Sequence, residues 1–114
     1  MPAPRVKRVY DPPADDDGLR LLVDRLWPRG IARERARIDR WMKDLAPSDA
    51  LRQQFHARPE RWPEFLAAYA AELRGQPALD ELRALARRQR VTLLYASRDT
   101  VHNNAVALAR LLHG

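Results

Sequence analysis

The stretch VTLLYASRDTVHNNAVAL, residues 91–108, decides the fold of this chain. Its first five residues form a mostly apolar run of strand length, and apolar side chains recur at helical spacing from Val101 onward. A strand that runs through a turn into a helix is typical of α/β domains built on a parallel sheet. The stretch therefore predicts a buried strand over Val91–Tyr95, followed by a closing helix.

The turn between that strand and that helix is unusually polar. Within eight residues it carries Ser97, Arg98, Asp99, Thr100, His102, Asn103 and Asn104. One capping residue is enough for such a connection, and Asp99 or Thr100 is the expected N-cap of the closing helix. If Val101 faces the sheet, helical spacing leaves Asn104 half-buried beside the strand end and points Asn103 away. A half-buried amide needs hydrogen-bond partners.

The rest of the chain predicts two more strands and four more helices, one of them short. Residues 5–10 alternate and are β-branched enough for a strand, residues 19–23 form an apolar run of strand length, and the Asp/Pro/Gly-rich segment between them predicts a turn. A short helix near residues 32–36, followed by an extended piece, is the favoured interpretation of the next segment. Ser48 is a good N-cap for the helix after it, and two amphipathic helices cover residues 59–75 and 77–90.

These elements predict one domain over residues 1–114. The expected fold is a small three-layer α/β domain, with a mostly parallel sheet of three to four strands and flanking helices. Hydrophobic residues make up 46% of the chain and charged residues 32%, which is typical of a globular protein.

Composition also narrows the chemistry. The chain has no cysteine, which excludes a disulfide framework, a thiolate nucleophile and a cysteine zinc site. Three scattered histidines do not predict a metal site, and no motif identifies a cofactor. The first residues lack the apolar core of a signal peptide, and no apolar run approaches the length of a membrane span, so we expect a cytoplasmic protein away from the membrane. The oligomeric state stays open.

Ligands of open α/β sheets bind beyond the carboxyl ends of the strands, and polar and aromatic residues follow two strand ends here. The predicted ligand-binding residues are Arg25, Trp27, Arg29, Tyr95, Ser97, Arg98, Asn103 and Asn104. The candidate acids and bases are Asp24, Asp99 and His102. The net charge of +6 makes an anion a plausible partner, and the free amides of the closing helix would help to hold it. The sequence therefore predicts binding of, or catalysis on, a small phosphorylated or nucleotide-like ligand, with the reaction type open.

Three alternatives remain. The polar turn could be an internal network that ties strands to helix, Trp27 could plug the core, and the basic charge could reflect only a preference for arginine. The domain could bind or process nucleic acid, which requires the arginines and Trp27 on one continuous face and steeply salt-dependent binding. It could also be a non-catalytic protein-interaction domain, which an exposed apolar patch would favour.

Several blocks resemble, in order, those of the YeaO-like family, domain of unknown function 488. They are RVYDPP, DGLRLLVDRLWPRG, DLAPSDALRQQF, RWPEFLAAYAAEL and VTLLYASRDTVHNNAVAL, and they span almost the whole chain. The resemblance implies a small α/β fold, a cytoplasmic protein and no established activity. Other branches carry cysteines and a Cys-His-Arg in the last strand–loop–helix, where this chain has Tyr95 and the run His102-Asn103-Asn104. Cysteine chemistry therefore does not carry over.

Overall fold

Four short strands form one parallel sheet in the computed structural model, which describes residues 4–113. The strands are β1 (Arg5–Arg8), β2 (Leu19–Leu22), β3 (Arg40–Trp41) and β4 (Val91–Tyr95), in the spatial order β1-β4-β2-β3. The last strand of the sequence therefore lies inside the sheet and pairs with both β1 and β2. The predicted parallel α/β fold is confirmed, and the extended piece expected after the second strand is the edge strand β3.

Alternate residues of the central strands contact two different apolar clusters, because successive side chains of a strand point to opposite faces. Leu21 and Leu93 belong to the large cluster on the helical face. Leu22 and Leu94 belong to a smaller cluster on the other face. All four side chains are fully buried, so both faces of the sheet are covered, as is usual for parallel sheets.

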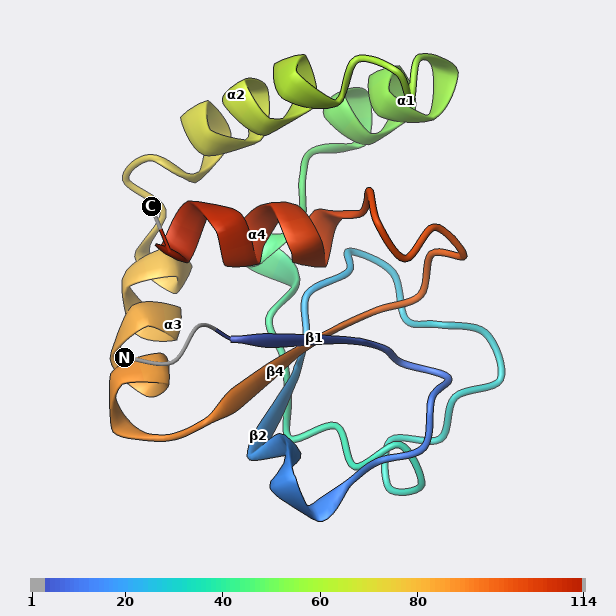
Figure 1. Cartoon of the computed structure of the whole chain (residues 1–114), viewed down its shortest axis with the longest axis vertical. Helices are drawn as coiled ribbons and strands as arrows, with labels where there is room; N and C mark the ends of the chain where they lie inside the picture. The colour runs from blue at the N-terminus through green and yellow to red at the C-terminus, as the bar shows by residue number, and fades with distance from the viewer. Residues whose placement is uncertain (1–3, 114) are drawn as a thin grey trace.

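The helices cover one face of the sheet. They are α1 (Asp49–Ala57), α2 (Trp62–Leu73), α3 (Pro77–Arg88) and α4 (Asn104–His113). Figure 1 shows α4 lying between the strands and the pair α1–α2, with α3 toward the amino end of β4. The predicted cap of α1 is confirmed, because Ser48 Oγ accepts a hydrogen bond from Leu51 N. The expected helix over residues 77–90 ends slightly earlier, at Arg88.

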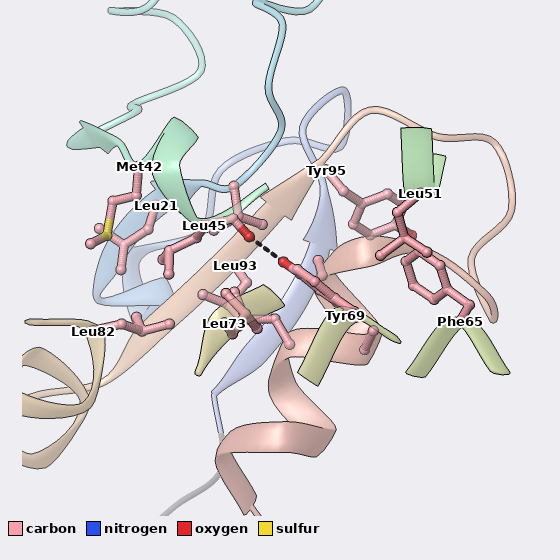
Figure 2. Packing of buried hydrophobic residues seen from close by; sticks show 14 of the residues in the cluster. Leu21, Met42, Leu45, Leu51, Phe65, Tyr69, Leu73, Leu82, Leu93 and Tyr95 are labelled. Carbon is pink, nitrogen blue, oxygen red and sulfur yellow. Dashed lines mark hydrogen bonds between the residues drawn. The ribbon is translucent and has the colours of Figure 1, made fainter. Parts of the chain in front are cut away.

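The large cluster includes the buried side chain of Tyr69, whose hydroxyl has a hydrogen-bond partner. Figure 2 shows Tyr69 of α2 among the leucines of the cluster, with its hydroxyl directed at Leu45. The hydroxyl donates to the backbone carbonyl of Leu45, which ends the short helix η2 (Lys43–Leu45). This bond fixes the segment between β3 and α1 against α2.

An irregular segment covers the other face of the sheet. Residues 33–37 form turns instead of the helix predicted near residues 32–36. The amide of Ala36 bonds the carbonyl of Ala32, but Arg37 has a positive φ of 50°, which interrupts a helix. Ala36 and Ile38 are buried there against Leu22 and Leu94.

A buried ion pair lies near the amino end of β2. Asp17 closes the short helix η1 (Asp15–Asp17), and its carboxylate accepts from Arg20 Nη1 at 2.6 Å and from Lys7 Nζ at 3.1 Å. The Asp17 and Arg20 side chains are 1% and 2% exposed. Arg20 also donates through Nε to the carbonyl of Ala36 at 2.9 Å, which ties the irregular segment to the sheet.

The closing helix begins later than the sequence predicts. Asn103 is its N-cap: the backbone carbonyl accepts from Ala107 N and the side-chain Oδ1 accepts from Val106 N at 2.9 Å. Asp99 instead closes a separate turn, since its Oδ1 accepts from the amides of Val101 and His102. The prediction that Val101 faces the sheet is therefore wrong. The side chain of Val101 is 63% exposed in the loop before α4.

Candidate functional site

Parallel pairing brings the ends of β2 and β4 together at one edge of the sheet. The amide of Val23 bonds the carbonyl of Leu94, so the residues that follow each strand are neighbours. Asp24 Oδ2 then accepts from the backbone amide of Ala96 at 2.9 Å. The carboxylate of Asp24 is thereby fixed at the start of the polar turn.

Asn104, in the first turn of α4, completes this contact. Its Nδ2 donates to the carbonyl of Val23 at 2.9 Å and to Asp24 Oδ1 at 3.1 Å. Asn104 is half-buried and hydrogen-bonded at the strand end, as the sequence predicts. Burial raises the pKa of Asp24, and the hydrogen bonds from Asn104 and Ala96 and the charge of Arg52 offset that effect only in part.

A cavity of about 260 Å³ opens above Asp24 and Asn104. Its lining comes from the end of β2, the segment before α1, α1 itself, α2 and the β4–α4 turn. The lining residues are Asp24, Arg25, Leu26, Trp27, Pro28, Ala46, Pro47, Arg52, Phe55, His56, Phe65, Ala96, Ser97, His102, Asn103 and Asn104. Seven of the eleven residues predicted for the site are in this set. They are Asp24, Arg25, Trp27, Ser97, His102, Asn103 and Asn104.

Two arginines supply positive charge to the lining. Arg25 Nε lies 3.6 Å from Asp49 Oδ1, and an Arg52 terminal nitrogen lies 3.5 Å from the same oxygen. The arginines are about half exposed, and Asp49 is more exposed still. One carboxylate thus lies between two guanidinium groups that are themselves half exposed, and these guanidinium groups are the positively charged groups of the cavity rim.

Aromatic rings form much of the wall. The ring centroids of Phe55 and Phe65 are 4.7 Å apart, and His102 packs on Trp62 with centroids 4.7 Å apart. Trp27 is tied by its own Nε1, which donates to the carbonyl of Ile31 at 2.8 Å. Trp27 packs against the smaller cluster and also lines the cavity.

Four predicted residues lie outside the lining. Tyr95 is 3% exposed within the helical-face core, where burial raises the pKa of its hydroxyl. Asp99 caps its turn, and those backbone hydrogen bonds lower its pKa. Arg98 and Arg29 are exposed and do not line the cavity, and the Arg29 carbonyl accepts from Tyr10 Oη at 2.9 Å.

Asn103 lines the cavity, but both polar atoms of its side chain already bond within the protein. Its Nδ2 donates to the carbonyl of Asp99 at 2.9 Å, while Oδ1 caps α4. The side chain is 3% exposed, not pointed away as predicted. Because α4 begins at Asn104, Asn103 is a buried cap and not a free ligand-binding amide.

Comparison with known proteins identifies the family. The family model described as "Inactive DUF488-N3 subclade" matches residues 4–114. The chain belongs to the DUF488 family. Among its DUF488 relatives are the uncharacterized protein Rv3073c of Mycobacterium tuberculosis, 47% identical over 96% of this chain and 93% of the relative, and the uncharacterized protein YeaO of Escherichia coli, 43% identical over 90% of each. No solved structure matches the chain. The predicted YeaO-like family is confirmed.

Sequence reasoning missed the share of α1 in the cavity of this DUF488 domain. Arg52, Phe55 and His56 all line it from one helix. Their i, i+3, i+4 spacing places them on one face of α1, a signal present in the sequence.

Two further features, a cluster of metal-ligating side chains and a membrane-spanning helix, are absent from the described residues. Among residues 4–113, no three His, Cys, Asp or Glu side chains group in a way that could hold a metal ion. In the same described part of the chain, no helix is long and apolar enough to cross a membrane.

Proposed function

We propose that this DUF488 domain binds a small nucleotide-like anion in the cavity at the carboxyl ends of β2 and β4, and that it does so without turnover. The observation that carries the proposal is the composition of that cavity: aromatic walls, two arginines at the rim, and Asp24 with Asn104 at the base. An apolar pocket with a few convergent polar groups is the usual form of a small-molecule site. Its volume of about 260 Å³, just below the usual range of ligand pockets, favours a small ligand over a large one.

The polar groups support binding more than catalysis. Ser97 Oγ accepts from the amide of Asp99 at 3.2 Å, and among residues 4–113 no hydrogen bond joins it to a histidine base. Both carboxylate oxygens of Asp24 accept protein hydrogen bonds, and Asp99 lies outside the lining. The word "Inactive" in the description of the matching family model agrees with a binding role.

The nucleic-acid alternative receives less support from the topology. Arg87 and Arg88 end α3, next to the amino end of β4, whereas Trp27 follows the carboxyl end of β2. In a parallel sheet these are opposite edges, so the arginines of α3 and Trp27 do not share one continuous face. Binding through the arginines of α3 alone would be a surface separate from the cavity.

Calorimetric titration with the four common ribonucleoside monophosphates, ribose 5-phosphate and a short single-stranded DNA, each at two salt concentrations, tests the proposal. We expect saturable binding of at least one nucleotide, with Arg52→Gln weakening it about tenfold because one charge-assisted contact to phosphate is lost. Arg83→Gln is the matched control, since Arg83 lies on α3 outside the cavity. It should bind as the wild type does.

Three results would contradict the proposal. The first is that no nucleotide binds. The second is binding of DNA alone that disappears at high salt, which would favour the nucleic-acid function. The third is chemical conversion of the bound nucleotide, detected by chromatography after incubation, which would show turnover.

A further inference from the structure

We propose that the base of this ligand is guanine, recognised at the bottom of the cavity by side-chain atoms that only accept hydrogen bonds. The inference rests on the function proposed above and names the ligand more closely. Asp24 and Asn104 already make hydrogen bonds within the protein. These bonds determine which of their atoms remain free to bind a ligand.

The orientation of the Asn104 amide is determined by its neighbours. The two groups that its Nδ2 contacts, the carbonyl of Val23 and the carboxylate of Asp24, are both acceptors. The nitrogen carries two hydrogens, and both are used. Rotating the amide by half a turn would place Oδ1 against two other oxygens, so Oδ1 must face away from them. Among residues 4–113, no donor contacts that oxygen, and Asn104 lines the cavity.

Asp24 also has oxygen atoms that can accept further hydrogen bonds. Oδ1 accepts one hydrogen bond from Asn104 and Oδ2 accepts one from Ala96, so each oxygen retains capacity for another. Both donors are neutral, and within the described part of the chain the carboxylate forms no ion pair. A half-buried carboxylate with only neutral donors gains from further donors supplied by a ligand.

The bottom of the cavity therefore offers the oxygens of Asp24 and Oδ1 of Asn104, all acceptors. Asn103 directs its donors to the protein, because Nδ2 donates one hydrogen to the carbonyl of Asp99 and its amide also contacts the Tyr95 hydroxyl, while Oδ1 caps α4. A ligand that fits must bring several donors on one edge. At the rim, Arg25 and Arg52 offer positively charged hydrogen-bond donors, which suit a phosphate.

Guanine meets this requirement better than the other common bases. Its N1–H and its exocyclic amine are adjacent donors, which match the two oxygens of one carboxylate. Adenine and cytosine each place a ring acceptor beside their exocyclic amine, and uracil places carbonyls on both sides of its single ring N–H. Each of these would bring an acceptor against the acceptors of Asp24 and Asn104, and an unpaired buried polar group is strongly rejected. The aromatic walls suit the flat ring.

The test compares dissociation constants of the wild-type protein for GMP, IMP, AMP, CMP and UMP. IMP retains the N1–H but lacks the exocyclic amine, so we expect it to bind roughly tenfold more weakly than GMP, and AMP, CMP and UMP at least as weakly as IMP. Asp24→Asn should remove the preference for GMP over IMP. Asp15→Asn, a change at an exposed aspartate far from the cavity, should retain it.

The outcomes separate this inference from the function on which it rests. Equal or tighter binding of AMP, CMP or UMP would overturn the guanine assignment and leave nucleotide binding intact. Equal binding of GMP and IMP would also overturn it. Absence of binding by every nucleotide would overturn both. The wild-type comparison decides the matter even if Asp24→Asn fails to fold.

Discussion

Asn104 joins α4 to the end of β2 through a single amide group. The two partners of its Nδ2, Val23 and Asp24, are about eighty residues away in the sequence. The neighbouring arginine of the turn, Arg98, has no such connection, because it is exposed and outside the cavity lining. Residues of one polar turn therefore differ sharply in what they contribute to the fold.

Replacement of these two side chains should separate their contributions. We expect Asn104→Ala to lower the free energy of unfolding by about 1–3 kcal/mol, because it leaves two half-buried acceptors without a donor. Arg98→Ala should change it by no more than about 0.5 kcal/mol, as for other surface positions. Urea unfolding followed by circular dichroism measures both. An equal loss of stability in the two variants would contradict this assignment.

At the scale of elements, Gly18 sets how closely β2 approaches the end of α3. It adopts φ 68° and ψ −140°, a region that only glycine occupies readily. A Cβ built on Gly18 would lie 2.1 Å from the backbone carbonyl oxygen of Arg90. The carbonyl of Arg90 also accepts from the amide of Leu19 at 3.0 Å, so neither backbone segment can move aside without losing the first contact between β2 and β4.

Gly18→Ala should therefore destabilise the protein by more than about 1 kcal/mol, because conformational strain and a backbone clash act together. Gly75→Ala is the matched control: Gly75 also has a positive φ, of 78°, but a Cβ there meets nothing within 4 Å. Thermal unfolding of the two variants compares them. A melting temperature for Gly18→Ala at or above that of Gly75→Ala would show that the close contact with Arg90 carries no cost.

The sequence predicted the elements better than their boundaries. The buried runs of β2 and β4 and the apolar face of α2 were recognisable because burial repeats at the strand and helix periods. The start of α4 was not, because Asp99, Thr100 and Asn103 are all competent caps and only the tertiary contacts decide among them. A helix that begins several residues later presents different faces, so Asn103 and Val101 exchanged their expected environments.

The sequence likewise predicted only part of the candidate site. The topological rule for parallel sheets found the strand ends, and with them Asp24, Arg25, Trp27 and Asn104. It could not find Arg52, because the rule concerns strand ends and α1 reaches the cavity only through its packing on α2. The ligand-binding role of these residues, and the cytoplasmic location, stay predictions.

At the scale of the whole molecule, the buried pair of Asp17 and Arg20 connects stability to pH. Burial acts to raise the pKa of Asp17, but the hydrogen bonds from Ala14, Lys7 and Arg20 outweigh it, and the net effect is a pKa below the usual 3.8. A carboxylate with a lowered pKa in the folded state contributes its full stabilisation above the unfolded value of about 3.8 and loses it as the pH falls through the folded value.

Asp17→Asn should lower the free energy of unfolding near neutral pH by about 3–5 kcal/mol, because it leaves the buried guanidinium of Arg20 without its counter-charge. The difference from wild type should begin to narrow as the pH falls below about 3.8, where the unfolded chain takes up a proton, and should disappear below the lower pKa of folded Asp17, where the native carboxyl is protonated as well. Denaturant unfolding across the acid range measures it. Asp15→Asn, from the same run of three aspartates but fully exposed, should follow the wild type throughout. A constant difference at every pH would exclude the charge of Asp17 as the cause.

The position of β4 inside the sheet has a consequence for the order in which the chain can fold during translation. β1 and β2 do not pair with each other, since β4 lies between them, and β4 leaves the ribosome long after both. The nascent chain can form α1, α2 and α3 early, but β1 and β2 can join one sheet only when Val91–Tyr95 has been made. A product released before that strand would leave β1 unpaired and the apolar strand β2 paired only with the two-residue strand β3, and it would be a substrate for chaperones and proteases.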